Sequence, residues 1–253
     1  MRFGVCIGGD AAKLKKAKEM GFDYAETGFD VFAREDETDY NAMAAAVKEC
    51  GLLYESANCF IPGTLPVNGN NVNDAALSAY IERGMSRGKP LGLRTVVFGS
   101  GGARMIHDGV SYARAAEQIA HFLKCVVAPL AEKYDITVVV EPLCDCTMVN
   151  TVKEGVLFAT MSGSDHVKGL ADLFHMAVMN DDVKNIRDVK GDLYHAHIAQ
   201  PAGRRYPTCG KCYDYKSFID ALEFAGCPRC SIEANTDDWE YDAPRALAVL
   251  RSL

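Results

Sequence analysis

The sequence predicts an α/β protein with a single (β/α)8 TIM barrel, and three observations support this fold class. Apolar runs typical of β-strands alternate with amphipathic helical segments along the whole chain. The alternation contains eight strand–helix pairs, and an unbroken series of this kind implies a parallel sheet covered by helices. The chain has 253 residues, close to the ~250 residues typical of one such barrel. Eight units therefore favour a closed barrel over an open, doubly wound sheet.

Each predicted strand is a short, mainly apolar run, and each is followed by a stretch with helical periodicity. In chain order, the predicted strands cover residues 2–7, 24–27, 53–57, 95–99, 137–141, 168–172, 193–198 and 229–233. The helices that follow them are predicted at residues 11–20, 40–50, 74–85, 111–134, 152–161, 182–189, 215–225 and 243–253.

Several helix ends have local signals of their own. Gly21, Gly51 and Gly226 each follow a helical run and would suit a left-handed C-terminal cap. Pro244 lies near the first turn of the last predicted helix, where its missing N–H matters little. We find no linker or low-complexity tract, so residues 1–253 are expected to form one domain.

Composition and charge exclude some classes of function. The net charge of -7 argues against a nucleic-acid partner, which would require a basic surface. No apolar run approaches the ~20 residues that cross a bilayer, and the N-terminus enters a strand without a signal-peptide pattern. We therefore expect no membrane partner and a cytoplasmic location. The ten cysteines are scattered through apolar segments and are expected to be buried thiols.

Four consecutive predicted strands end in a side chain that can bind a metal ion. In a barrel the C-terminal strand ends point into one funnel, where active sites are built. A single strand-end glutamate is more often a helix cap or a surface ion pair, but four such ends in succession favour one divalent metal. The oxygen-rich set suits Mn2+ best, with Mg2+, Co2+ and Zn2+ as alternatives. The predicted ligands are Glu141, Asp172, His197 and Glu233.

Four segments of the chain resemble a known enzyme family. VVVEPL, LADLFHM, HAHIAQPAGR and SIEANT are similar to the sugar phosphate isomerase/epimerase family, the xylose isomerase-like TIM barrels. Within it they are nearest to the D-tagatose/D-psicose 3-epimerase and hydroxypyruvate isomerase group. The resemblance covers essentially the whole chain, and the segments that carry the four predicted ligands are its most specific part.

The resemblance implies a metal-dependent sugar epimerase or isomerase that acts on a ketose or related small sugar through an enediolate. By motif, the four predicted ligands match the family's metal ligands. Glu141 and Glu233 also match its acid/base pair, whereas His175 and Arg204 match residues that bind substrate. Barrels of this family often form dimers or tetramers, so a homo-oligomer is a further expectation.

Other residues near the predicted funnel leave the substrate open. Glu26 and Asn58 follow early strands and are candidates for substrate binding, although Glu26 could instead be structural. In the epimerase group a substrate-holding glutamate follows the strand-five ligand by six residues. Thr147 stands at that position here, and Asp145 is the candidate to replace it.

Two further motifs have alternative interpretations. The glycine-rich stretch 99–104 could hold a phosphate or carboxylate, or could be a tight turn. The pairs Cys209–Cys212 and Cys227–Cys230 resemble a zinc ribbon, but a helix of about 11 residues, some 16 Å long, lies between them. One tetrahedral ion could not join both pairs, and we expect no structural zinc.

Three alternative functions share the predicted barrel. The same site could support a lyase or dehydratase that eliminates a group next to a ketone. A non-catalytic sugar-binding barrel would keep the metal without proton exchange. A DNA-repair endonuclease of the same fold shares the Asp172/His175 spacing, but it needs further histidines where this chain has Glu26 and Asn58.

Overall fold

Eight parallel strands pair in sequence order around a closed barrel in the computed structural model, which describes residues 1–106 and 109–253. Pairing of the first and last strands closes the barrel, with Arg2 opposite Arg229 and Val5 opposite Ile232. The predicted fold class is therefore confirmed. The strands are β1 (Arg2–Cys6), β2 (Tyr24–Gly28), β3 (Tyr54–Asn58), β4 (Thr95–Phe98), β5 (Thr137–Val140), β6 (Val167–Asp172), β7 (Leu193–Ile198) and β8 (Arg229–Ile232).

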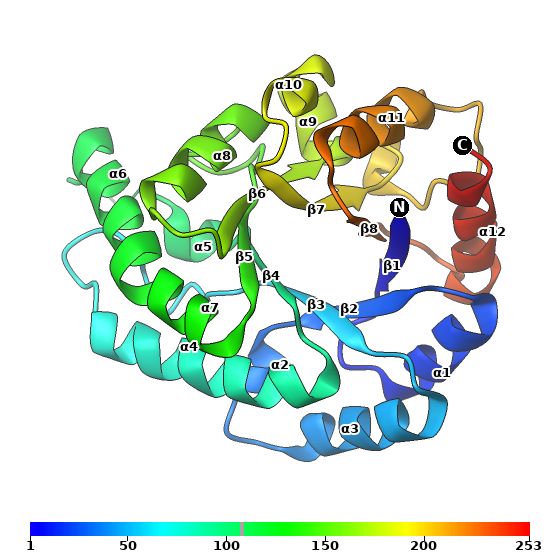
Figure 1. Cartoon of the computed structure of the whole chain (residues 1–253), viewed down its shortest axis with the longest axis horizontal. Helices are drawn as coiled ribbons and strands as arrows, with labels where there is room; N and C mark the ends of the chain where they lie inside the picture. Colours follow the sequence, from blue (N-terminus) through cyan, green and yellow to red (C-terminus); the bar gives the residue numbers. More distant parts are fainter. Residues whose placement is uncertain (107–108) are drawn as a thin grey trace.

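Helices form a ring around these central strands (Figure 1). None of the helices within the described residues is long and apolar enough to cross a membrane. The α-helices are α1 (Ala11–Met20), α2 (Asp30–Ala33), α3 (Thr38–Cys50), α4 (Asp74–Gly88), α5 (Gly101–Arg104), α6 (Tyr112–His121), α7 (Ala128–Tyr134), α8 (Val152–Met161), α9 (Leu173–Met179), α10 (Lys184–Asp188), α11 (Tyr215–Ala225) and α12 (Trp239–Arg251). Three short helical turns join them: η1 (Lys89–Leu91), η2 (Phe122–Val127) and η3 (Ala202–Arg204).

The glycine caps were predicted correctly, but several helices differ from the sequence prediction. Gly21, Gly51 and Gly226 end α1, α3 and α11 in the left-handed conformation, with φ of 91°, 72° and 81°. Helix α12 begins four residues earlier than expected, because the Asp238 carboxylate caps it by accepting from the backbone N–H of Tyr241. Pro244 therefore lies inside this helix and not in its first turn, which corrects the prediction.

The long helix predicted for residues 111–134 is divided by the π-helical turn η2. Pro129, at the start of α7, has no N–H to donate to the preceding turn. Helical segments with this wider hydrogen-bond pattern occur mostly as single turns inside α-helices. Helix α9 was not predicted at all, although it begins immediately after Asp172 and places that residue at its N-cap.

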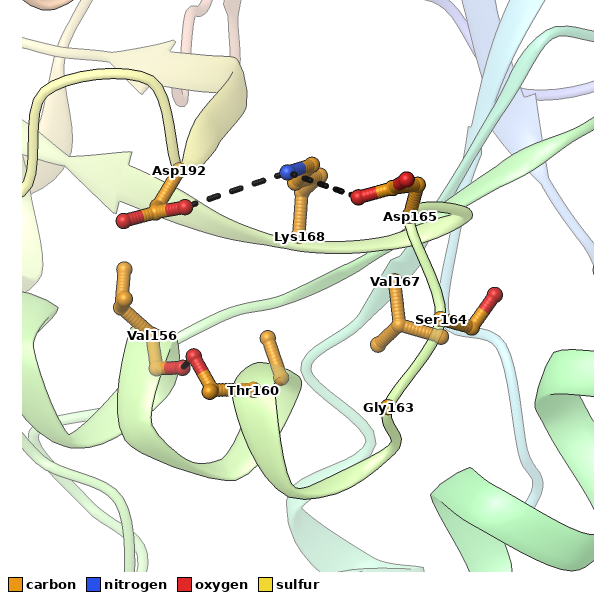
Figure 2. Close-up of a pocket in the computed structure, with 9 residues that line it drawn as sticks. Val156, Thr160, Gly163, Ser164, Asp165, Val167, Lys168 and Asp192 are labelled. Carbon is orange, nitrogen blue, oxygen red and sulfur yellow. Dashed lines mark hydrogen bonds and ion pairs between the residues drawn. The ribbon is translucent and has the colours of Figure 1, made fainter.

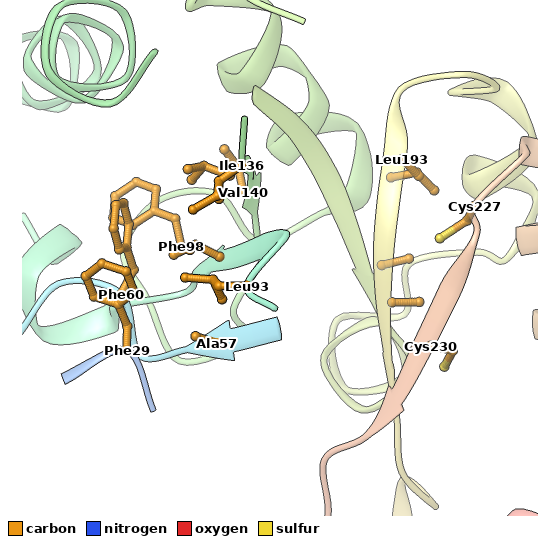
Figure 3. Packing of buried hydrophobic residues seen from close by; sticks show 14 of the residues in the cluster. Phe29, Ala57, Phe60, Leu93, Phe98, Ile136, Val140, Leu193, Cys227 and Cys230 are labelled. Carbon is orange, nitrogen blue, oxygen red and sulfur yellow. The ribbon is translucent and has the colours of Figure 1, made fainter. Parts of the chain in front are cut away.

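Apolar side chains fill the space between the barrel and the surrounding helices. Phe29, Phe60 and Phe98 are fully buried, and their rings pack in sequence with centroid distances of 4.9 and 6.2 Å (Figure 3). Both contacts are edge-to-face, the arrangement that aromatic quadrupoles favour. This layer packs the barrel strands against the helices that surround them.

The inside of the barrel has an apolar side and a polar side. Val97, Val139 and Leu170, from β4, β5 and β6, form a buried apolar cluster. Across from them, the Ser231 hydroxyl donates to the Tyr24 hydroxyl at 3.0 Å. Tyr24 fits because its neighbour on β1 is Gly4, where a Cβ atom would lie 2.2 Å from the tyrosine ring.

Ion pairs around the buried Glu55 lie at the N-terminal end of the barrel. Glu55 is only 5% exposed and accepts from the Arg2 guanidinium at 2.8 Å. Arg229 lies on β8, the strand that pairs with β1, and its guanidinium is 3.5 Å from the same carboxylate. These charges are compensated within their own layer, far from the opposite, C-terminal end of the strands.

We predict that Gly4→Ala lowers the free energy of unfolding by about 1–3 kcal/mol, because the added methyl group forces the Tyr24 ring or β1 to move. Urea unfolding of both proteins measures the difference. Gly210→Ala is the control, since its Cβ would make an ordinary 3.5 Å contact with Val249. Equal unfolding midpoints for Gly4→Ala and wild type would contradict this account of the barrel interior.

Candidate metal centre

The four predicted ligands converge at the C-terminal end of the barrel, and we call them the four-residue cluster: Glu141, Asp172, His197 and Glu233. One potential ligand atom from each lies within 4.8 Å of those of the others. The Nδ1 atom of His197 lies 2.9 Å from Glu141, 3.3 Å from Glu233 and 3.8 Å from Asp172. His197 is fully buried, and Asp172 and Glu141 are 1% and 5% exposed.

Local structure places each carboxylate. Asp172 ends β6 and accepts from the His175 N–H at 3.0 Å, so the unpredicted helix α9 fixes its side chain. Glu141 follows β5, and its Oε2 atom occupies space that Gly99 leaves free, since a Cβ there would lie only 2.2 Å away. The backbone carbonyl of Glu141 accepts from the fully buried Arg104 guanidinium at 2.8 Å.

Glu26 lies beneath the cluster and is completely buried. Its two carboxylate oxygens accept from the Nε2 atoms of His195 and His197, both at 2.9 Å. With both oxygens used in this way and no exposed surface, Glu26 is not placed to contact substrate. These contacts therefore favour the structural alternative for Glu26 over a role in substrate binding.

Two other predicted residues contact Glu233. Asn58 donates from its side-chain nitrogen to Glu233 Oε1 at 2.9 Å. Arg204 donates to the other oxygen of Glu233 and lies 3.6 Å from Asp172. The guanidinium group also lies over the ring of Phe174, 4.8 Å from its centroid. Both residues therefore border the cluster, and Arg204 partly offsets its negative charge.

The backbone of Arg204 has a left-handed conformation, which helps to set the position of its side chain. Its φ angle of 48° is in the left-handed region, which costs a non-glycine residue about 1 kcal/mol or more. The carbonyl of Arg204 accepts from the Asn235 N–H at 2.7 Å, which ties the loop after β7 to the one after β8. Such a conformation persists only where surrounding contacts determine it.

His175 lies beside the cluster and has one ring nitrogen available. Its Nδ1 atom accepts from the Cys144 N–H at 3.1 Å, so its hydrogen resides on Nε2. Nε2 lies 3.9 Å from Asp172. Burial, together with nearby Arg204, lowers the pKa of His175 to about 4, so the ring is neutral near pH 7.

The loop after β5 directs Thr147 and Asp145 to different surroundings. Thr147 is exposed, and its hydroxyl accepts from the Ile106 N–H at 2.8 Å. A carboxylate oxygen of Asp145, in contrast, lies within 4.8 Å of a His175 ring nitrogen. Asp145 is thus the acidic group of this loop that borders the funnel.

The cluster environment separates the pKa values of its carboxylates. Burial raises the pKa of Glu141, and burial together with Glu141 raises the pKa of Asp172 to about 7. Burial alone would also raise the pKa of Glu233, but His197 and Arg204 outweigh it and lower that pKa to about 2.

The histidine of the cluster responds in the opposite sense. Burial disfavours the charged ring, but Glu233, Glu26 and Glu141 outweigh burial and raise the pKa of His197 well above its usual value. The two histidine partners in turn outweigh burial at Glu26 and hold its pKa well below the usual range. Arg204, which pairs with Glu233, supplies part of the positive charge beside these acids.

The residues present fit a divalent cation. Three carboxylates crowded around one imidazole nitrogen are unfavourable unless a positive charge lies among them. His197 donates from Nε2 to Glu26, so its Nδ1 can turn a lone pair toward the carboxylates once it loses its proton. Oxygen ligands with one imidazole suit Mn2+ and Mg2+, and also Co2+ and Zn2+.

The sequence prediction overlooked one side chain of this centre. The thiol of Cys6 lies within 4.8 Å of ligand atoms of His197 and Glu233. Cys6 ends β1, so the rule that located the four ligands would also have found it.

Two sequence motifs have structural roles. In the stretch 99–104, Ser100 accepts from the Ile61 N–H at 2.9 Å, and the α-helical part, α5, spans only four residues. These contacts support the tight turn and not an anion site.

Cys209 and Cys212 form a disulfide, which corrects their interpretation as buried thiols and leaves no thiolates there for zinc. Cys227 and Cys230 are buried thiols as predicted, among apolar side chains of the β7–β8 region (Figure 3).

A separate surface pocket lies at the other end of the barrel. It is bordered by α8 and the start of β6, with Lys168 between Asp165 and Asp192 at 3.9 and 3.8 Å (Figure 2). Lys168 precedes Asp172 by four residues on β6, which at ~3.3 Å per residue places the pocket about 13 Å below the cluster. The pocket is therefore not part of the candidate metal centre.

Known proteins share this sequence pattern and fold. A family model described as "Xylose isomerase-like TIM barrel" matches residues 14–253. A D-psicose 3-epimerase from Agrobacterium fabrum (strain C58 / ATCC 33970) is 24% identical over 212 residues, which cover 78% of this chain and 70% of the relative.

Solved structures of low sequence identity have the same fold. The structure of a D-psicose 3-epimerase in the presence of D-fructose matches with a TM-score of 0.82 and 21% sequence identity. The match covers 100% of this chain and 99% of the epimerase chain. A 3-keto-D-glucoside 4-epimerase from E. coli has a TM-score of 0.81 and 22% identity, with 100% of both chains covered.

We predict that the cluster binds Mn2+ more tightly as the pH rises. The metal competes with protons on His197, whose pKa is raised, and on Asp172, with a pKa of about 7. Affinity should therefore increase with pH through neutrality, by about tenfold per unit for each proton displaced, and level off above both pKa values. Mn2+ titrations over a pH series measure this dependence, and an affinity that does not change below pH 7 would contradict it.

Gly99→Ala is predicted to weaken Mn2+ binding by about tenfold or more, because its methyl group takes the space of the Glu141 carboxylate. Gly101→Ala is the matched control, since its Cβ would lie 3.4 Å from Leu143 and does not meet a ligand. Equilibrium binding of Mn2+ to both variants decides the point. Equal Mn2+ affinities for the two variants would contradict the prediction, because they would mean that Glu141 can move aside without weakening metal binding.

Proposed function

The chain belongs to the xylose isomerase-like TIM barrel family, and we propose that it is a divalent-metal-dependent sugar epimerase or isomerase. Its substrate is a ketose or a related small keto sugar. The observation that carries this proposal is the four-residue cluster, in which Glu141 from β5 and Glu233 from β8 approach the same nitrogen of His197. Two carboxylates held around one cation site can act on a substrate from different sides.

The relatives support the reaction class. The similar proteins are a D-psicose 3-epimerase and a 3-keto-D-glucoside 4-epimerase. In both names the carbon that is inverted lies next to a carbonyl carbon. The shared chemical requirement is removal of a proton beside a ketone, and this requirement defines the substrate class that we propose here.

When bound, a divalent cation would polarise the substrate carbonyl and acidify the neighbouring C–H bond. One glutamate of the Glu141/Glu233 pair removes the proton from this carbon, and the other returns a proton. Return to the opposite face of the same carbon gives the epimer, whereas return to the adjacent carbon gives the isomer. The pair suits both steps because its two environments favour different protonation states.

Two further residues orient the sugar in this proposal. His175 presents its Nε2–H beside Asp172 and can donate to a substrate oxygen. Arg204 is fixed by its backbone and by the Phe174 ring, and its guanidinium can donate to a second oxygen while it remains paired with Glu233. Asn58 keeps the Glu233 carboxylate in position through its hydrogen bond.

The test is incorporation of solvent deuterium into a panel of ketoses, 3-keto sugars and short hydroxyketones with Mn2+ added. We expect wild type to exchange deuterium into at least one of these classes. Glu141→Gln and Glu233→Gln should each slow the exchange by about a hundredfold or more, because each removes a proton-transfer group. The product separates epimerisation, isomerisation and elimination of a leaving group.

Glu55→Gln is the matched control, since it removes a buried carboxylate at the opposite end of the barrel. It should retain exchange wherever it remains folded. Failure of wild type to bind Mn2+ would reject the metal-dependent proposal. Binding of Mn2+ without exchange of any compound would instead favour a sugar-binding barrel.

A further inference from the structure

The contact between Glu26 and His197 points to a role beyond satisfying a buried charge. Glu26 Oε1 lies 2.9 Å from Nε2 of His197, whereas Nδ1 of the same ring faces the three carboxylates of the cluster. An ionised carboxylate can only accept, so Nε2 carries a hydrogen. The hydrogen bond therefore determines which ring nitrogen is free to bind a cation.

The Glu26 carboxylate is itself held on its other side. Its Oε2 atom accepts from Nε2 of His195 at 2.9 Å, and all three side chains are fully buried. Ser56 and Ser231 place their hydroxyl oxygens 3.4 Å from the same His195 nitrogen. The carboxylate is thus oriented by β7 from two points, at residues that face the same side of that strand.

We propose that Glu26 is a positioning residue that fixes the tautomer and orientation of His197 so that Nδ1 faces the metal ion. This inference rests on the proposed function, because it assumes that the four-residue cluster holds a divalent cation. Glu26 touches neither the cation nor the substrate in this arrangement. It acts only through the imidazole ring.

The geometry predicts that an amide cannot satisfy both histidines as the acid does. Both oxygens of Glu26 accept from an Nε2–H group, whereas a glutamine offers only one oxygen and one NH2 group. One of the two histidines would then face a donor and have to give up its Nε2 hydrogen. For His197, this would put the hydrogen on Nδ1, where the metal should bind.

The test compares Mn2+ affinity in wild type, Glu26→Gln and Glu55→Gln, measured by the electron paramagnetic resonance signal of free Mn2+. We expect Glu26→Gln to weaken binding by about 10–100-fold, the usual effect of losing a partner of a metal-binding histidine. Glu55→Gln also removes a buried carboxylate inside the barrel, but it should bind Mn2+ as wild type does.

A second measurement does not depend on the variant being folded. Nitrogen-15 NMR of the histidine rings in the Mg2+-saturated wild type should show His197 with hydrogen on Nε2 and none on Nδ1. Wild-type Mn2+ affinity in Glu26→Gln, or a His197 ring without hydrogen on Nε2, would overturn the role of Glu26 alone. A wild-type protein that binds neither ion would overturn the proposed function together with this inference.

Discussion

The concentration of negative charge at the C-terminal end of the barrel is the constraint on which the rest of the site depends. Three carboxylates lie within reach of one imidazole nitrogen, and a fourth supports the ring from below. Only Glu233 among these acids has substantial exposure, with 22% of its side chain accessible. Charges so poorly solvated repel one another strongly unless positive charge lies between them.

The surrounding structure supplies part of this compensation and fixes its geometry. Arg204 pairs with Glu233 and Asp172 from above, and its position is set by a left-handed backbone and by Phe174. Small residues make room where acids must fit, as Gly99 does for Glu141. Helix α9 begins at Asp172, so the same residue caps a helix and faces the cluster. The folded barrel thus holds the three carboxylates of the cluster close together despite their mutual repulsion.

The two ends of the barrel handle buried charge in different ways. At the N-terminal end, Glu55 is balanced by Arg2 and Arg229, and the group is complete without any ligand. At the C-terminal end, three carboxylates surround one imidazole nitrogen, and the neighbouring glutamates raise the pKa of His197 well above its usual value. The ion pairs of Glu55 neutralise its charge within the protein. The carboxylates of the four-residue cluster remain in excess, and a bound cation can neutralise them. This difference explains why one end is a structural layer and the other is a candidate active site.

The sequence by itself determined the barrel and the four residues that meet at its C-terminal end. Strand periodicity fixes which side of the barrel a residue faces, and parallel strands bring their C-terminal ends together, so Glu141, Asp172, His197 and Glu233 could be predicted from local pattern alone. Only the tertiary structure decided the partners of these residues. Glu26 is separated from His197 by 171 residues, and Arg104 from the Glu141 carbonyl by 37, and no local signal encodes either contact. Loop directions were equally unpredictable, because the turn that points Thr147 toward Ile106 and leaves Asp145 near His175 depends on packing between separate loops. Periodicity is a property of neighbours in the chain, whereas these contacts follow from barrel closure, which brings distant segments together.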